Sequence, residues 1–119
     1  MYLKKTVQLL LVVLVLSVSV GCSQGEPESA WKMINSGALL VDVRSPGEFN
    51  QGHLPDAKLI PVGDVESRIA EFGDDKNRPI VVYCKAGVRA AKAINVLKEH
   101  GYTNVLNGGG YSDLMASRP

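Results

Sequence analysis

The chain of 119 residues has only two cysteines, Cys22 and Cys84, so a framework of several disulfides is excluded. It also has only two histidines, His53 and His100, and no cluster of cysteine and histidine has the spacing of a metal site. Aromatic residues make up 6% of the chain and no long basic run occurs, which argues against nucleic acid as a partner. We therefore expect neither a bound metal nor a nucleic-acid ligand.

The only long apolar stretch lies at the start of the chain. Residues 6–20 carry no charge and directly follow Lys4 and Lys5. A basic start followed by an apolar stretch is typical of a secretory signal, and this stretch is shorter than the roughly 20 residues that span a bilayer. We assign residues 1–21 to a signal peptide. Without its two lysines, 11 basic residues remain against 12 acidic ones, a net charge of about −1.

Cys22 follows small residues at the end of this apolar stretch and resembles the processing site of a bacterial lipoprotein, where the cysteine becomes the lipid-modified N-terminus. Plain signal cleavage is the alternative. We favour lipidation of Cys22, with residues 22–27 as a polar linker, residues 28–119 as one domain, and a location in the periplasm or cell envelope. Cys84 is then the one free thiol of an exported protein, and such a thiol is expected to be reactive.

The remaining sequence alternates β-rich runs with helical patterns. Strands are predicted at residues 39–43, 57–60, 80–83 and 104–106, and helices at residues 28–36, 46–50, 64–72 and 88–100. In the third of these helices Asp64 is the predicted cap, and Gly108 to Gly110 are expected to lead into a terminal helix. This alternation predicts an α/β fold with a mainly parallel central sheet flanked by helices on both faces.

Cys84 lies between the clearest strand and the clearest helix of the chain. Ligands of parallel sheets bind just beyond the carboxyl ends of the strands, which is where this thiol is predicted to lie. The start of a helix carries partial positive charge, and Lys85 and Arg89 add two cations, so we expect the thiolate to be favoured over the thiol. The free N–H groups of the helix start form a bowl for an anion, which small Ala86 and Gly87 leave open.

A nucleophile that faces an anion-binding bowl indicates transfer of a group from an anionic donor. A buried structural cysteine is the alternative, because free cysteine is among the most buried residue types. The two cations near Cys84 favour the reactive interpretation.

Four segments resemble the single-domain rhodaneses, a family of thiosulfate sulfurtransferases, and above all their exported phage-shock-protein-E-like members. Residues 84–89 resemble the C-x-x-G-x-R active loop, and residues 41–49 resemble D-V-R-x-x-x-E-F. Residues 52–57 resemble G-H-I-P-G-A, and residues 107–111 resemble G-G-x-x-W, with Tyr111 in place of tryptophan. The order of the four segments makes the resemblance specific.

The resemblance implies a rhodanese-like domain that transfers sulfane sulfur without a cofactor. The loop thiolate of Cys84 would take sulfur from thiosulfate, release sulfite and pass the sulfur from a persulfide to a thiol or cyanide. The substrate-binding residues would be Lys85, Ala86, Gly87, Val88 and Arg89. Their backbone N–H groups would hold the persulfide and the substrate oxygens, and the side chains of Lys85 and Arg89 would attract the anion. Ala86 stands where two-domain thiosulfate enzymes have a second basic residue.

Other polar residues are given structural roles. Asp42 and Arg44 are expected to form an ion pair or a backbone clamp near the loop, and Glu48 to pair with Arg44 or to be solvated. His53 is expected to bond within a turn. Two further functions stay open. One is a non-catalytic sulfur carrier or binding module, and the other is a cysteine phosphatase or arsenate reductase, although those use C-x5-R and only four residues separate Cys84 from Arg89.

Overall fold

The computed structural model describes residues 25–119, and their centre is one four-stranded sheet in the order β2-β1-β3-β4 with every pair parallel. The strands are β1(Leu39–Asp42), β2(Lys58–Leu59), β3(Ile80–Cys84) and β4(Val105–Gly110). The helices are α1(Pro27–Asn35), α2(Pro46–Asn50), α3(Val88–Glu99) and α4(Tyr111–Ala116), with two 3-10 helices, η3(Val62–Asp64) and η4(Ile69–Phe72). The predicted signal peptide and Cys22 lie outside the described residues.

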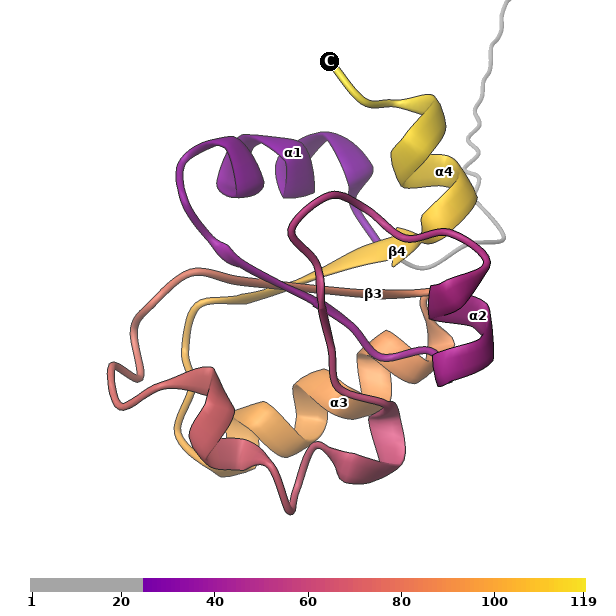
Figure 1. The fold of residues 1–119 in the computed structure, drawn as a ribbon. Coiled ribbons are helices and arrows are strands. Elements are labelled where there is room, and N and C mark those ends of the chain that lie inside the picture. The colour runs from indigo at the N-terminus through magenta and orange to yellow at the C-terminus, as the bar shows by residue number, and fades with distance from the viewer. Residues whose placement is uncertain (1–24) are drawn as a thin grey trace, which may run out of the picture.

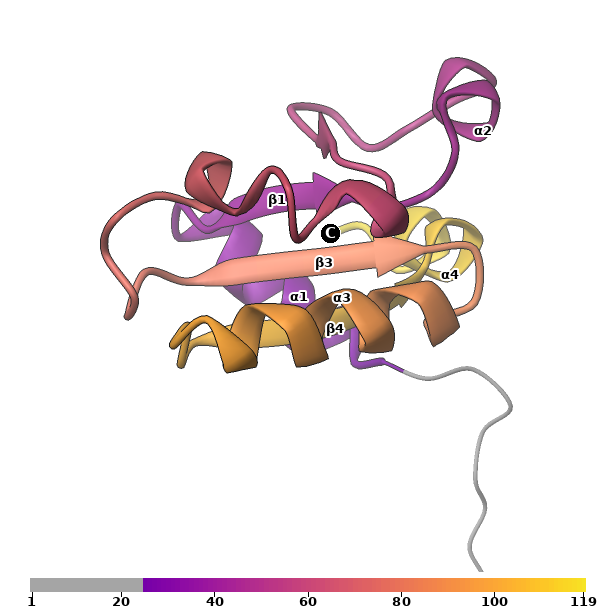
Figure 2. The ribbon, with the colours of Figure 1, turned by 90° about the horizontal axis from the view of Figure 1, so that it is seen from below.

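Helices cover both faces of the sheet, so the predicted α/β fold is confirmed (Figure 1). α1 and α4 lie on one face, where the indole N–H of Trp31 donates to the carbonyl of Leu114 over 2.9 Å. α3, η3 and η4 lie on the other face, and Figure 2 shows α3 running along β3 and β4. Within residues 25–119 no helix is long and apolar enough to cross a bilayer.

β3 is one of the two inner strands of the sheet, and all five of its residues are buried. Side chains alternate along a strand. Val81 and Tyr83 accordingly enter the core beneath α1 and α4, while Val82 and Cys84 enter the core beneath α3. The continuous apolar run predicted this doubly covered strand. The alternation then sets the side of the sheet on which the thiol of Cys84 lies.

The segment after β2 differs from its prediction. Instead of one helix capped by Asp64, it forms η3 and η4, and Asp64 ends the first of them. The backbone N–H of Val62 bonds to Val43 beside β1, and the buried side chains of Val65 and Phe72 hold the segment against α3. These tertiary anchors determine the path of a short segment whose own helix propensity is weak.

β4 is longer than its prediction because the glycines join the sheet. Gly109 pairs with Tyr83 and Gly110 with Cys84, after a β-bulge that leaves Gly108 as the extra residue. A Cβ on Gly110 would lie 2.3 Å from the carbonyl oxygen of Lys85. Glycine is thus required there by the close approach of two backbones.

The described chain also begins inside the predicted linker. α1 starts at Pro27, and the N–H of Glu26 donates to the carbonyl of Asn107 over 2.9 Å. A Cβ on Gly25 would lie 2.3 Å from the backbone nitrogen of Gly109. Residues 25–27 are therefore packed against the carboxyl end of β4.

Candidate active site

The loop that follows β3 folds back on the thiol of Cys84. The backbone N–H of Gly87 donates to the sulfur, with 3.0 Å between nitrogen and Sγ. Gly87 has φ +92°, a left-handed conformation that glycine adopts readily, and it directly precedes α3. Cys84 is a free thiol and only 1% exposed. The sulfur therefore lies in the protein interior, at the start of a helix and with a hydrogen-bond donor aimed at it.

The start of α3 supplies further donors near this sulfur. Within residues 25–119, the backbone N–H groups of Val88, Arg89 and Ala90 have no acceptor, as is usual for the first turn of a helix. On the outside of the loop Lys85 and Ala86 are exposed. The arrangement is thus a buried cysteine sulfur that accepts one backbone N–H, from Gly87, and lies next to the free N–H groups at the start of α3.

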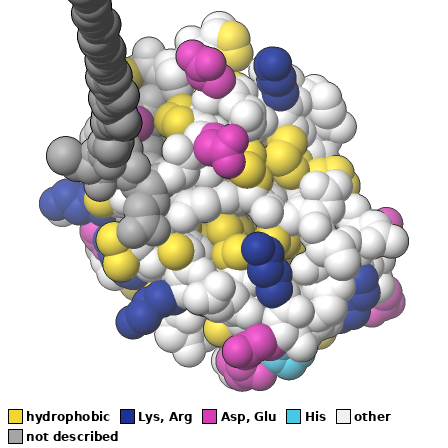
Figure 3. Space-filling model, turned by 180° about the vertical axis from the view of Figure 1, so that it is seen from behind, with side chains coloured by type: hydrophobic (Ala, Val, Ile, Leu, Met, Phe, Trp, Pro, Cys, Tyr) yellow, Lys and Arg dark blue, Asp and Glu magenta, His cyan; other side chains and the backbone are white. Residues whose placement is uncertain are grey.

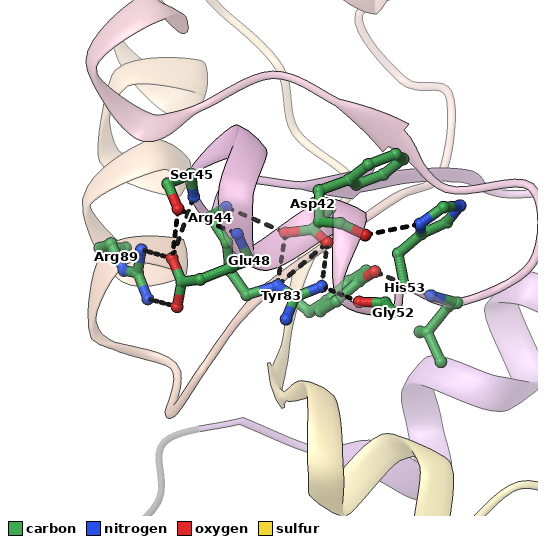
Figure 4. A network of polar contacts seen from close by, with 10 residues as sticks. Asp42, Arg44, Ser45, Glu48, Gly52, His53, Tyr83 and Arg89 are labelled. Carbon is green, nitrogen blue, oxygen red and sulfur yellow. Dashed lines mark hydrogen bonds and ion pairs between the residues drawn. The ribbon is translucent and has the colours of Figure 1, made fainter.

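Arg89 is held by an acidic partner from α2. Its guanidinium donates to both carboxylate oxygens of Glu48, at 2.7 and 3.0 Å, as Figure 4 shows. Glu48 also closes a capping box with Ser45, whose N–H donates to the carboxylate over 3.0 Å. The prediction that Glu48 pairs with Arg44 or is solvated is therefore wrong. The pairing joins α2 to α3 across the loop.

The two contacts of Glu48 give the protein a pH dependence. Hydrogen bonds from Arg89 first, and then from the Ser45 backbone, lower the pKa of the Glu48 carboxyl from 4.5 to about 2. The folded chain thus holds this proton less tightly than the unfolded chain. The stabilisation is complete above pH 4.5 and is lost as the pH falls through about 2.

We expect wild-type protein to be more stable than the Glu48→Gln variant above pH 4.5, by a margin that shrinks as the pH falls towards about 2. Urea unfolding of both proteins across this range measures the margin. The Glu71→Gln variant is the control, because Glu71 forms a similar pair with Arg68 far from the loop and its pKa is also lowered to about 2. A margin for Glu48 that does not change with pH contradicts the expectation.

Asp42 and Arg44 form the predicted ion pair at the end of β1. The Arg44 guanidinium donates to Asp42 at 2.7 to 3.1 Å, and the Arg44 backbone N–H donates to the same carboxylate at 2.9 Å (Figure 4). The guanidinium also donates to the carbonyl of Gly52 over 2.7 Å and lies 4.6 Å from the ring centre of Tyr111. Both charged groups are buried, so the pair serves to hold the segment after β1 against the start of α4.

A cleft of about 250 Å³ opens beside the loop, between α2 and the start of α4. It is lined by Arg44, Glu48, Gln51, Gly52, Lys85, Tyr111 and Ser112. Arg44 and Glu48 are charge-paired, whereas Lys85 makes no ion pair within the described part of the chain. The cleft therefore carries one uncompensated positive charge where the sequence predicted two, from Lys85 and Arg89.

Three of the lining residues were missed by the sequence analysis. Tyr111 was noted only as a replacement for tryptophan, and Gln51 and Ser112 belong to no motif. They reach the cleft because α2 and α4 meet beside the loop. No signal in the sequence predicts that meeting, since the two helices are separated by about half of the chain.

The two histidines contact other side chains and backbone away from the loop around Cys84, one within its own turn and one across the chain. His53 Nδ1 lies 2.9 Å from the carbonyl oxygen of Phe49, and its ring is stacked on the Phe49 ring. His100 pairs with Glu66 at 2.6 Å.

Burial raises the pKa of the Tyr83 phenol well above its ordinary value, and this phenol accepts the Leu54 N–H. Over residues 25–119, no three His, Cys, Asp or Glu side chains lie close enough to hold a metal ion.

The surface behind the view of Figure 1 bears mixed charge. Figure 3 shows basic and acidic side chains interspersed over this face, among larger areas of uncharged surface. Nothing on this face resembles the continuous basic stripe that nucleic-acid-binding domains present.

Comparisons with known proteins agree with the fold. The sequence profile of the rhodanese-like domain matches residues 26–116. Thiosulfate sulfurtransferase PspE of Escherichia coli (strain K12) is 43% identical over 74 residues, which cover 62% of this chain and 71% of that protein. A sulfurtransferase of Allochromatium vinosum is 42% identical over 69 residues, covering 58% and 63%. A solved structure of a rhodanese with anions from E. coli is 40% identical, with a TM-score of 0.63, and the match covers 70% of this chain and 95% of that one.

Proposed function

The chain belongs to the rhodanese-like domain family, and from that premise we propose that it moves sulfane sulfur from thiosulfate, or a similar anionic donor, to a thiophilic acceptor through a persulfide on Cys84. Relatives that are named sulfurtransferases support a role in sulfur transfer. The observation that carries the proposal is the contact from the Gly87 N–H to the sulfur of Cys84 at the start of α3. A purely structural cysteine has no need of such a donor.

Two displacements at sulfur make up the proposed reaction. In the first, the Cys84 thiolate attacks the outer sulfur of thiosulfate, a new S–S bond forms, and sulfite leaves with the electron pair of the bond that breaks. In the second, a thiolate or cyanide attacks the outer sulfur of the persulfide, and the Cys84 thiolate is the leaving group. Neither step transfers a proton or changes the overall electron count, so the reaction needs no general base.

The site residues then divide into two groups. Backbone N–H groups between Lys85 and Arg89 stabilise the thiolate and the terminal sulfur of the persulfide, because they remain in place when the charge moves from one sulfur to the other. Lys85 attracts the anionic donor into the cleft. Arg89 is committed to Glu48, so its contribution is to hold the loop between α2 and α3. Asp42 and Arg44 support the same end of the sheet, and Arg44 also lines the cleft.

The non-catalytic carrier and the phosphatase remain the competing functions. The loop argues against a phosphatase, because four residues between Cys84 and Arg89 make a smaller bowl than the five of the C-x5-R enzymes. In addition, the guanidinium that a phosphatase would turn towards its substrate is paired here with Glu48. A carrier would also take up sulfur on Cys84, and it would differ from the enzyme only in not repeating the reaction over many cycles.

One assay separates the three functions. The enzyme is expected to release sulfite in proportion to the thiosulfate consumed when cyanide is present, over many turnovers, and to gain about 32 Da, one sulfur atom, when cyanide is absent. A carrier gains the mass but releases only about one equivalent of sulfite per chain. Hydrolysis of a phosphate monoester without any sulfite release would replace the proposal with the phosphatase.

We also propose that the protein is exported and anchored to the cell envelope through lipid on Cys22. The support is the sequence pattern of residues 1–22, which lie outside the described residues. Labelling of cells with radioactive palmitate tests it, because incorporation has to be lost in the Cys22→Ser variant. If the label persists in this variant, or never appears in wild type, lipidation of Cys22 is excluded and plain signal cleavage is the remaining explanation.

A further inference from the structure

The side chain of Asn107 reaches from the sheet to the loop around Cys84. Asn107 pairs with Val82, whose side chain lies in the core beneath α3, so the two side chains share that face of the sheet. The β-bulge begins at the next residue, Gly108. β-bulges beside active sites re-aim side chains. This one turns the strand just where it meets the loop.

Both ends of the Asn107 amide are bonded. Its Nδ2 donates to the carbonyl of Gly87 over 2.9 Å, and its Oδ1 accepts the N–H of Gly109 over 2.8 Å. A carbonyl on one side and an N–H on the other determine which way the amide faces. The backbone carbonyl of Asn107 also accepts the N–H of Glu26. The side chain is therefore held in one orientation by the loop at Gly87 and by its own strand at Gly109, while Glu26 holds only the backbone of Asn107.

Gly87 is the residue on which these contacts converge. Its carbonyl accepts from Asn107 and from the N–H of Ala91, at 3.0 Å, in the first turn of α3. Its own N–H donates to Cys84 Sγ. Glycine in the left-handed conformation rotates freely in the absence of tertiary restraint. The two bonds on the carbonyl side supply that restraint, and so they keep the N–H directed at the sulfur.

We propose that Asn107 is a positioning residue for sulfur transfer, which acts by holding Gly87 so that its N–H points at the sulfur of Cys84. The role of Asn107 in sulfur transfer rests on the proposed function. Its effect on the thiol of Cys84, through Gly87, does not. From the sequence alone, Asn107 is only the first residue of a glycine motif. Its bond to Gly87, 20 residues away, is made at the point where β4 meets the loop.

The Asn107→Asp and Asn107→Ser variants test the proposal. Aspartate has the same shape and keeps an acceptor for Gly109, but it presents an oxygen to the Gly87 carbonyl and adds a negative charge near the sulfur. Serine also offers an acceptor to Gly109 and is too short to reach Gly87. The matched control is Asn104→Asp, the same change in an exposed residue just before β4, whose amide donates to the carbonyl of Asn77 over 3.4 Å.

We expect kcat for sulfite release to fall about 10- to 100-fold in Asn107→Asp and about 10-fold in Asn107→Ser, with KM changed less than about 3-fold, because a misdirected donor weakens the reacting state more than binding. The pH profile for alkylation of Cys84, measured with Cys22→Ser as the background, should move to higher pH in Asn107→Ser, which removes the bond to Gly87 without adding a charge near the sulfur. Asn104→Asp should match wild type in both measurements.

These readouts separate positioning from mere stability, since loss of stability alone moves neither kcat of the folded fraction nor an alkylation profile. If Asn107→Asp does not fold, Asn107→Ser gives the same comparison. Folded variants with wild-type kcat and an unchanged alkylation profile overturn the proposal. If wild type does not turn over thiosulfate but the alkylation profile still moves in the uncharged Asn107→Ser variant, then the proposed function fails and the positioning of Gly87 stands.

Discussion

The Cys84→Ser variant is expected to lose sulfite release by at least about 1,000-fold and to gain no mass on treatment with thiosulfate. A serine hydroxyl remains protonated at neutral pH and forms no stable bond to a sulfane sulfur. The variant should fold, because serine is slightly smaller than cysteine and its oxygen can accept the Gly87 N–H that now bonds to the sulfur. Intact-protein mass spectrometry and a sulfite assay measure the two losses.

The matched control for this prediction is the other cysteine. Cys22→Ser makes the same chemical change in a residue that the proposed mechanism does not use, so mass gain and turnover should equal those of wild type. A sulfur adduct that survives in Cys84→Ser would assign the nucleophile to another residue. Such a result would remove the basis of the proposed function while leaving the family membership unchanged.

Gly110→Ala is expected to lower kcat/KM for sulfur transfer by about 100-fold, the loss typical of a displacement of about 1 Å in an active site. The added Cβ would lie 2.3 Å from the carbonyl oxygen of Lys85 and 3.4 Å from the Cα of Ala86, so the loop has to move outwards. The backbone of Gly110, with φ −103° and ψ 148°, accommodates alanine without strain. The effect is therefore steric, and it falls on the loop around Cys84.

Gly63→Ala is the matched control, because a Cβ there meets nothing within 4 Å and the residue does not have a positive φ. It should leave both kcat/KM and stability close to wild type. Urea unfolding of Gly110→Ala should show a loss of about 1–3 kcal/mol, typical of an overpacked site. Wild-type kcat/KM in a folded Gly110→Ala protein would mean that the Lys85 carbonyl can move without disturbing the sulfur, against this account of the loop.

The prediction of the fold succeeded where the pattern was strong and local. The run from Ile80 to Tyr83 and the stripe of Ala90, Ala93, Ile94 and Leu97 predicted β3 and α3 to within one residue. The segment from Asp64 to Phe72 was wrongly predicted as one helix, because contacts with β1 and α3 override the local preference. The glycines of β4 were expected only to lead into the terminal helix, because nothing in the sequence shows that another backbone lies against them.

The prediction of the site likewise succeeded for features set by nearby residues and failed for a contact between distant ones. The left-handed Gly87, the buried strand end at Cys84 and the ion pair of Asp42 with Arg44 all join residues that are at most a few positions apart. The partner of Glu48 was missed. It is Arg89, 41 residues away, and the choice between two arginines depends on which one Asp42 already holds. Whether Glu48 binds Arg44 or Arg89 is therefore decided only when β1 and β3 lie side by side in the folded sheet.

By itself, the sequence determined the chemistry that this protein has available: a cysteine at the end of a buried strand, a glycine that can turn the chain back towards it, and a helix start that follows at once. These follow from local rules, since strand alternation, glycine backbone freedom and unpaired helix-start N–H groups act within a few residues. Only the tertiary structure decided which charges remain free and what holds the loop. Glu48 neutralises Arg89, Lys85 is left facing the cleft, and Asn107 restrains Gly87, because the parallel sheet aligns the ends of strands that are far apart in the chain.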